Sequence, residues 1–130
     1  MITYSRKVFF YETDAQGIVH HSNYPRYFEE ARGYFLEKNG YPYEVIRSKY
    51  KLDVVLTGLE IKYKKFLEFG DTFYINLKPK KENRYFFSFY YEVFNQKKQL
   101  ICNGKTSHCF IRTENRKITS IPEFISNIIL

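Results

Sequence analysis

The residues best suited to acid–base chemistry lie together near the amino terminus, in the stretch YETDAQGIVHHSNYPRYFEEAR at residues 11–32. Asp14 stands in front of a small, turn-prone segment that ends at Gly17. Two imidazoles, those of His20 and His21, follow a few residues later. A carboxylate held in a loop can accept a proton from water or attack a carbonyl carbon itself. The pattern therefore indicates acid–base or nucleophilic chemistry at this loop.

A helix is expected to follow directly and to position these groups. Residues 23–38 carry apolar and aromatic side chains at helical spacing. Ser22 or Asn23 can act as the N-cap, and Pro25 suits the first turn. The free backbone N–H groups and the dipole of such a helix start favour negative charge. A base beside an anion-stabilising helix end is what transfer of an acyl group to water requires.

The rest of the chain has the pattern of strands. After residue 53 the apolar pattern changes to a period of two, and short turns separate segments that would pair as antiparallel neighbours. The expected strands are residues 2–11, 54–66, 71–80, 84–95 and 98–112. One long helix among five strands predicts an α+β fold. A length of 130 residues suits one domain, which we expect to span residues 1–130.

The strand expected at residues 84–95 is almost entirely apolar and aromatic. Such a composition is typical of a strand that is buried on both faces. A single helix covers only one face of a sheet, so a second subunit would have to cover the other face. We therefore expect a homo-oligomer.

Composition narrows the range of partners and compartments. The chain has 21 Lys and Arg residues against 14 Asp and Glu residues and is 20% aromatic, but it contains no nucleic-acid-binding motif. A basic surface suits a phosphate-bearing ligand equally well. No apolar stretch is long enough to cross a membrane, and the first residues lack the pattern of a secretion signal. Cys102 and Cys109 are expected to be free thiols. We expect a cytoplasmic protein with no membrane span and no nucleic-acid partner.

The stretch around Asp14 resembles the signature of the 4-hydroxybenzoyl-CoA thioesterase family, and most closely that of its YbgC-type acyl-CoA thioesterases. In that signature an Asp precedes a small-residue turn ending in Gly, two hydrophobic residues, an aromatic or His pair, Asn-Tyr, and a helix with Glu and Arg. The matching residues here are Asp14, Gly17, Ile18, Val19, His20, His21, Asn23, Tyr24, Glu29 or Glu30, and Arg32. A weaker resemblance covers nearly the whole chain.

The resemblance implies a hotdog fold, in which a curved antiparallel five-stranded sheet wraps around one long helix, and assembly into a dimer or tetramer. It implies hydrolysis of an acyl-CoA thioester to a carboxylic acid and free coenzyme A, with no metal and no cofactor. Three alternatives stay open: an acyl-carrier-protein thioester as the substrate, a non-catalytic hotdog protein that binds acyl-CoA or acts as a scaffold, and, more weakly, a dehydratase. A carboxylate that faces the thioester favours hydrolysis over simple binding.

For Asp14 the resemblance implies a catalytic role, either as the general base for water or as a nucleophile that forms a mixed anhydride. A loop Asp by itself would also suit a turn or capping residue. His21 matches the position whose backbone N–H faces the thioester oxygen, and its imidazole is a second catalytic candidate beside the plainer role of capping the helix. Gly17 permits close approach of the backbone. His20 and Tyr24 are expected to line the substrate pocket.

Basic residues are the candidates for binding the phosphates of coenzyme A. Arg84 falls where family members place such residues, and Lys80 and Lys81 belong to the same expected turn. A solvated basic turn is the alternative interpretation. Lys64 and Lys65, near the end of their expected strand, are weaker candidates.

Overall fold

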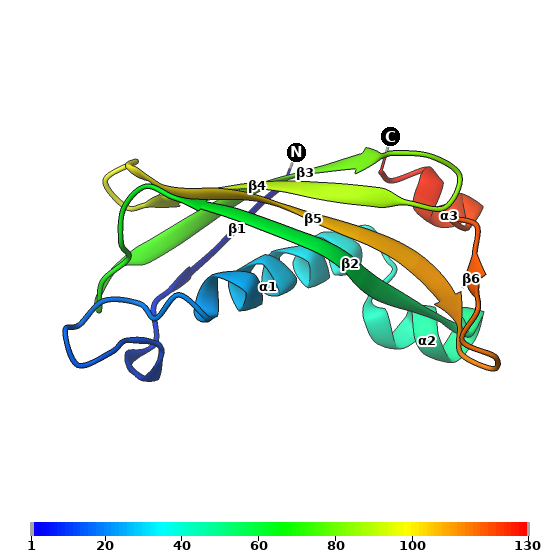
Figure 1. Ribbon diagram of the computed structural model, residues 1–130, viewed down its shortest axis with the longest axis horizontal. Coiled ribbons are helices and arrows are strands. Elements are labelled where there is room, and N and C mark those ends of the chain that lie inside the picture. Colours follow the sequence, from blue (N-terminus) through cyan, green and yellow to red (C-terminus); the bar gives the residue numbers. More distant parts are fainter. Residues whose placement is uncertain (1, 130) are drawn as a thin grey trace.

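The computed structural model describes residues 2–129, in which one antiparallel sheet curves around the long helix α1 (Asn23–Lys38) (Figure 1). The strands are β1 (Ile2–Lys7), β2 (Leu52–Tyr63), β3 (Thr72–Lys81), β4 (Phe87–Asn95), β5 (Leu100–Arg112) and the two-residue β6 (Ile118–Thr119). They lie in the order β1-β3-β4-β5-β2, with β6 paired to the end of β5. The predicted α+β architecture, a curved sheet around one long helix, is confirmed. The expected count of five strands omitted β6, which forms because the tail folds back beside β5.

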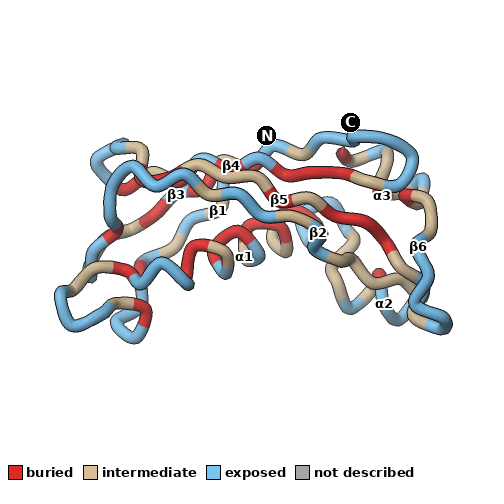
Figure 2. The backbone as a smooth tube through the Cα atoms, viewed as in Figure 1, coloured by how far each residue is buried: buried red, intermediate tan, exposed pale blue. Residues whose placement is uncertain are grey.

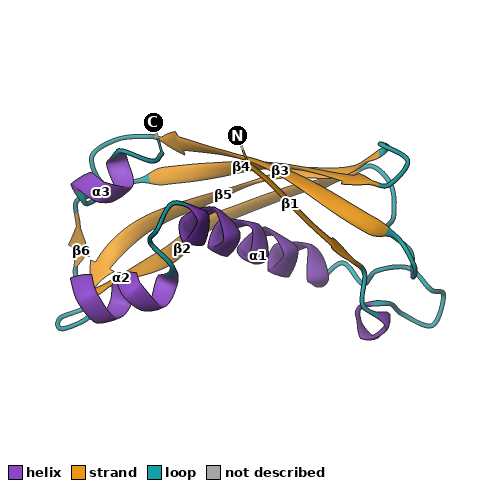
Figure 3. Ribbon diagram, turned by 180° about the vertical axis from the view of Figure 1, so that it is seen from behind, coloured by secondary structure: helices purple, strands orange, loops and turns teal. Residues whose placement is uncertain are grey.

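Three short helical elements complete the chain: η1 (Phe10–Glu12), α2 (Tyr43–Tyr50) and α3 (Glu123–Ser126). Figure 3 shows α1 lying across the concave face of the sheet, while α2, α3 and β6 gather at one end. The loops that precede α1 and β3 lie at the other end. No helix within residues 2–129 has the length and apolar character to cross a bilayer.

The core lies between α1 and the concave face of the sheet, where the buried residues of both are concentrated (Figure 2). Phe28 of α1 stacks on Tyr91 of β4, with ring centroids 4.1 Å apart and planes 5° apart. Gly104 of β5 makes room for this pair, because a Cβ there would lie 2.6 Å from the Phe28 ring. Helical spacing on α1 and a missing side chain on β5 together let the helix pack closely on the sheet.

The first strand is shorter than predicted. Strand β1 ends at Lys7, and the aromatic residues Phe10 and Tyr11, expected to extend it, lie in η1 and are 74% and 76% exposed. The chain turns here and buries the carboxylate of Glu12 instead, which is 4% exposed. A charged side chain is buried only when partners on other elements compensate its charge, and such partners are not visible in the pattern of apolar residues.

The prediction that residues 84–95 are buried on both faces requires a second subunit, and the single chain buries one face. Strand β4 begins at Phe87, and it alternates: Phe89 and Tyr91 face the core, whereas Tyr90 and Glu92 are exposed on the convex face. The side chains of β4 therefore divide between a core face and an exposed face, as in an ordinary strand that is buried on one side.

One edge of the sheet, at β2, carries exposed apolar side chains. Strand β2 pairs only with β5 among residues 2–129, so its other edge is unpaired. Leu56, Leu59 and Tyr63 on this strand are 49%, 43% and 50% exposed. Exposed apolar side chains beside an unpaired edge are typical of a surface that a partner covers.

Candidate active site

Residues 13–22, called the site loop below, join η1 to α1 and form a tight turn. The Asp14 N–H donates to the Ile18 carbonyl over 2.9 Å, and the Gly17 N–H donates to the Asp14 carbonyl over 3.0 Å. Gly17 has φ +80°, a conformation that residues with a side chain rarely adopt. Gly17 therefore shapes the turn that holds Asp14, as its place in the motif predicted, but it does not line the pocket described below.

The site loop is also tied to the connection between β2 and β3. The Val19 N–H donates to the Leu67 carbonyl over 2.8 Å, and the Phe69 N–H donates to the Gly17 carbonyl over 2.9 Å. Because both contacts are backbone hydrogen bonds, they fix the path of the loop whatever its side chains are. The two connections thus form one unit at this end of the sheet.

The carboxylate of Asp14 is oriented by the turn and is only partly engaged. Its Oδ1 accepts hydrogen bonds from the backbone N–H groups of Gln16, over 2.8 Å, and Ile18, over 3.4 Å. Its Oδ2 has no hydrogen-bond donor among residues 2–129, and the side chain is exposed. Asp14 therefore acts as a turn residue, as its position in a loop suggested. Its second carboxylate oxygen can still meet water or a carbonyl carbon.

The two histidines lie against each other, with ring centroids 4.2 Å apart. His20 Nδ1 accepts from the Ser22 N–H over 3.2 Å and lies 2.8 Å from Ser22 Oγ. An accepting Nδ1 places the proton of a neutral imidazole on Nε2. Within residues 2–129 no hydrogen bond joins the His21 imidazole to Asp14, one of the contacts considered for it.

The N-cap prediction is only half right. Ser22 occupies the N-cap position of α1, but its side chain makes no hydrogen bond to the first turn of the helix. Its hydroxyl lies beside His20 instead. Backbone carbonyls, rather than a capping side chain, accept the hydrogen bonds of the first turn.

The backbone donors at the helix start differ in whether they have an acceptor. The Asn23 N–H donates to the His20 carbonyl over 3.0 Å, the Tyr24 N–H reaches the His21 carbonyl at 3.4 Å, and Pro25 has no N–H. The His21 N–H has no acceptor among residues 2–129. A free N–H beside the positive end of a helix dipole can stabilise an oxyanion.

These groups border one pocket of about 310 Å³. It is lined by Asp14, Ile18, Val19, His20, His21, Tyr24, Tyr63 and Phe66. Apart from the polar groups of Asp14 and the histidines, the lining is apolar or aromatic, as in ordinary small-molecule sites. The structure therefore brings together four of the residues predicted from sequence, three on the site loop and one on α1.

Tyr24 forms the floor of the pocket and is also part of the core. It is 2% exposed, and its hydroxyl accepts a hydrogen bond from the Leu67 N–H over 3.2 Å. Burial raises the pKa of Tyr24 to about 12, so the phenol stays neutral. Its ring meets Tyr63 edge to face at 5.5 Å. Sequence reasoning missed Tyr63 and Phe66, although the period of two in β2 places Tyr63 on the same face as Ile61.

The basic residues predicted to bind phosphates are not near this pocket in the same chain. Lys80, Lys81 and Arg84 lie at the end of β3 and in the turn after it, at the opposite end of the sheet (Figure 1). Lys81 Nζ lies 3.3 Å from Ser126 Oγ, next to α3. A pocket in one chain could meet these side chains only in another copy of the protein.

Other lysines do lie next to the pocket. Lys64, Lys65 and Lys97 border a neighbouring hollow of about 420 Å³, which shares Phe66 with the pocket at Asp14. Lys97 comes from the turn between β4 and β5, far along the sequence. The weaker sequence candidates, Lys64 and Lys65, are thus the better placed, and Lys97 could not have been found without the fold.

The remaining polar groups in the core are not arranged as a metal site. His108 is 1% exposed and its Nε2 lies 2.8 Å from Thr106 Oγ1. Burial, with the nearby Arg32, lowers the pKa of His108 to about 3. Cys102 and Cys109 are buried free thiols on β5. Among residues 2–129 no three His, Cys, Asp or Glu side chains are grouped to hold a metal ion.

Known proteins resemble this chain in sequence and in fold. Residues 8–129 match the thioesterase-like superfamily. A putative esterase of Aquifex aeolicus is 46% identical over 126 residues, which are 97% of this chain and 95% of the relative. A 1,4-dihydroxy-2-naphthoyl-CoA hydrolase of Crocosphaera subtropica is 29% identical over 122 residues, 92% of this chain and 89% of the relative. The crystal structure of a hypothetical protein from Aquifex aeolicus, 45% identical, covers 100% of both chains with a TM-score of 0.93.

The sheet that curves around one helix, together with the family match, places the chain in the class of hotdog thioester hydrolases. The chain belongs to the thioesterase-like superfamily.

Proposed function

We propose that this protein is an acyl-CoA thioesterase of the YbgC type, which uses water to convert an acyl-CoA into a carboxylic acid and free coenzyme A. One observation carries the proposal. The same pocket holds the Asp14 carboxylate, with its Oδ2 free, and His21, whose N–H has no acceptor among residues 2–129. A base or nucleophile and an oxyanion donor are the two groups that thioester hydrolysis needs.

Two roles for Asp14 fit this geometry. As a general base, Asp14 takes a proton from water while the water oxygen attacks the carbonyl carbon. The resulting oxyanion accepts a hydrogen bond from the His21 N–H, and its collapse breaks the C–S bond and releases the thiolate, which is then protonated. As a nucleophile, an Asp14 oxygen displaces the thiolate and forms a mixed anhydride that water hydrolyses.

The pocket supports an acyl group with apolar or aromatic character. Tyr24, Tyr63 and Phe66 provide aromatic surface, and His20 and Ile18 complete the wall. Relatives that are 28–29% identical carry the name 1,4-dihydroxy-2-naphthoyl-CoA hydrolase, and one at 29% is named a putative acyl-CoA thioesterase. An aromatic acyl-CoA therefore belongs among the substrates, with an acyl-carrier-protein thioester as the alternative donor of the same acyl group.

A second copy of the chain would complete the site. The pocket ends at Tyr63 and Phe66, which are 50% and 66% exposed and lie at and just beyond the end of the unpaired strand β2. Pairing of two such edges would cover Leu56 and Leu59 as well. We propose a homodimer, or a tetramer made from such dimers, in which the site loop of one copy approaches β2 of the other.

Lysines beside the pocket would bind the phosphates of coenzyme A. Lys64, Lys65 and Lys97 lie around the hollow that continues from the pocket past Phe66. Lys80, Lys81 and Arg84 would contribute only from another copy, because the same chain holds them at its far end.

A screen of acyl-CoA esters with detection of the released thiol tests the proposed function. It should cover short and long aliphatic acyl groups, benzoyl-CoA and 1,4-dihydroxy-2-naphthoyl-CoA, with one acyl group also offered on acyl carrier protein. Wild-type protein should release thiol from at least one CoA ester, and Asp14→Asn should not. Thiol release that Asp14→Asn leaves unchanged would contradict the assignment, and binding without release would favour the non-catalytic alternative.

The phosphate contacts can be tested with a matched pair of double variants. Lys64→Ala with Lys65→Ala should raise KM for the CoA ester about fivefold while kcat stays nearly constant, because a remote contact binds substrate and transition state alike. Lys80→Ala with Lys81→Ala removes the same charge at the far end of the sheet, and a rise in KM for this pair would mean that another copy supplies phosphate contacts. A pantetheine thioester, which lacks the nucleotide, should show no difference among the variants. If Lys64→Ala with Lys65→Ala raises KM for the pantetheine thioester as much as for the CoA ester, Lys64 and Lys65 are not phosphate contacts.

A further inference from the structure

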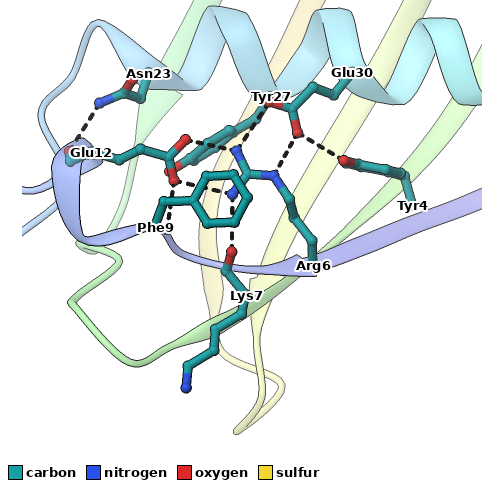
Figure 4. A network of polar contacts seen from close by, with 8 residues as sticks. All are labelled: Tyr4, Arg6, Lys7, Phe9, Glu12, Asn23, Tyr27 and Glu30. Atoms are coloured by element: carbon teal, nitrogen blue, oxygen red, sulfur yellow. Dashed lines mark hydrogen bonds and ion pairs between the residues drawn. The ribbon is translucent and has the colours of Figure 1, made fainter.

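Directly before the site loop lies a carboxylate that is buried and fully occupied. Glu12 is 4% exposed, and its carboxylate accepts hydrogen bonds from three residues (Figure 4). Arg6 donates through Nη2, over 2.6 Å, and through Nη1, over 3.1 Å. The Phe9 N–H donates over 2.8 Å, and the Tyr27 hydroxyl donates over 2.9 Å. Both oxygens therefore hold donors, and neither is available to substrate.

The surroundings keep this carboxylate ionised. Burial alone raises the pKa of Glu12, but the hydrogen bonds from Arg6, Phe9 and Tyr27 outweigh it and bring the pKa below its ordinary value. Arg6 also lies over the Phe9 ring, 4.0 Å from its centroid, which shields the ion pair. A buried ion pair with several further hydrogen bonds holds its partners in place. Breaking it would leave an uncompensated charge in the interior, which costs much free energy.

The backbone of the same residue joins the two ends of the site loop. The Glu12 carbonyl accepts the His20 N–H over 2.9 Å and the Asn23 side-chain amide over 2.9 Å. The first bond fixes the residue directly before His21, and the second fixes the first residue of α1. Glu12 thus connects β1, η1, both ends of the site loop and, through Tyr27, the helix.

We propose that Glu12, held by Arg6, is the positioning residue of this site. It fixes both ends of the site loop so that the carboxylate of Asp14 and the N–H of His21 keep the separation that the reaction needs. Asp14 itself has only the hydrogen bonds of its own turn. Backbone hydrogen bonds to Leu67 and Phe69 tie that turn to the sheet, and Glu12 ties it to β1 and to the start of α1. This inference rests on the proposed thioesterase activity and assigns Glu12 no contact with substrate.

Glu30 supplies a matched control. It accepts from Arg6 Nε over 2.7 Å, from Arg6 Nη2 over 3.0 Å and from the Tyr4 hydroxyl over 2.8 Å (Figure 4). It therefore shares the same guanidinium with Glu12, but none of its hydrogen bonds reaches residues 8–22. Glu30→Gln should weaken the network without releasing the site loop.

The test compares Glu12→Gln with Glu30→Gln in kcat, KM and amide hydrogen exchange. Glu12→Gln should lower kcat about 10- to 100-fold and change KM less than threefold, because misplacement of a catalytic group acts on the chemical step. Exchange of the site-loop amides should become at least ~10-fold faster while that of β4 stays constant. Glu30→Gln should keep kcat within about threefold of wild type. An equal loss of kcat in both variants, or a kcat of Glu12→Gln within threefold of wild type, would overturn the proposal.

If Glu12→Gln does not fold, Asn23→Ala replaces it, since that change removes one tie of the loop and leaves the ion pair intact. It should lower kcat and speed up exchange in the same direction. The exchange measurement needs no turnover. If wild-type protein hydrolyses no thioester, the proposed function fails, while unchanged loop exchange in Glu12→Gln would separately refute the anchoring role.

Discussion

Glu12 and Asp14 are carboxylates two positions apart in the sequence, and the fold gives them opposite surroundings. Glu12 is 4% exposed and its carboxylate is held by Arg6, Phe9 and Tyr27. Asp14 is exposed, and only its Oδ1 accepts hydrogen bonds, both from its own turn. The same functional group is a structural anion at the first position and a candidate base or nucleophile at the second.

This difference shows what a reactive carboxylate in a loop requires. A group that must meet substrate cannot also be surrounded by donors, because those donors stabilise its charge and occupy its lone pairs. A loop that presents such a group to solvent is mobile unless another residue fixes it. Here the two demands fall on neighbouring residues, Glu12 for rigidity and Asp14 for reactivity.

The largest expected effect is on catalysis, from Asp14→Asn. The change is nearly isosteric and Oδ1 can still accept the turn hydrogen bonds, so the free energy of unfolding should stay within about 0.5 kcal/mol of wild type. Loss of the base or nucleophile should lower kcat by at least ~100-fold. Steady-state kinetics measures the loss of kcat, and urea unfolding measures the free energy of unfolding. Turnover within tenfold of wild type would remove the distinction between the two carboxylates.

Glu12→Gln should instead lower stability as well as activity. Removing one charge of a buried ion pair leaves Arg6 with Glu30 as its remaining carboxylate, so we expect a loss of about 2 kcal/mol in the free energy of unfolding. Urea unfolding at neutral pH gives the value. A variant as stable as wild type would mean that the ion pair contributes nothing to the fold.

The contribution of Glu12 should also depend on pH in a defined direction. Its pKa in the folded protein lies below the ordinary value of 4.5, so its stabilisation is fully present above that value and is lost as the pH falls through the folded pKa. The difference in unfolding free energy between wild type and Glu12→Gln should therefore be constant from pH 7 to about pH 5 and shrink below about pH 4. A difference that grows on acidification would contradict this sign.

The smallest effect should come from the turn itself. Gly17 has φ +80° and a Cβ placed there meets no atom within 4 Å, so Gly17→Ala should cost only the conformational penalty, about 1 kcal/mol. Gln16→Ala is the control, because the backbone N–H of Gln16, not its side chain, binds Asp14. Thermal unfolding of the two variants checks the prediction. Equal stability would show that the turn tolerates a side chain in this conformation.

Several elements could be predicted from sequence because local chemistry decides them. Helix α1 has the predicted bounds of residues 23–38, since its apolar period and the Pro25 in its first turn are local signals. Strands β3 and β5 lie within two residues of their expected ranges. The placement of Asp14, His20, His21 and Tyr24 around one pocket also followed from a motif that is continuous in the chain.

Errors arose where burial depends on distant partners. The aromatic residues before Glu12 have the composition of a strand, yet they form η1 because Glu12 turns inward to meet Arg6. Burial of β4 on both faces stays a prediction, because α1 covers one face and only a second subunit could cover the other. Composition records which residues could be buried, whereas the packing of elements decides which of them are.

The sequence by itself determined the α+β architecture, the long helix and the loop that carries Asp14, because periodicity and turn residues act over short stretches of chain. Only the tertiary structure shows that Lys97 lies beside the pocket and that Glu12 is buried. It also shows that Lys80, Lys81 and Arg84 lie at the far end of the sheet. The physical reason is that the curvature of the sheet and the order of its strands set distances between residues far apart in sequence. Such distances, rather than residue type, decide which charges are compensated and which remain free to react.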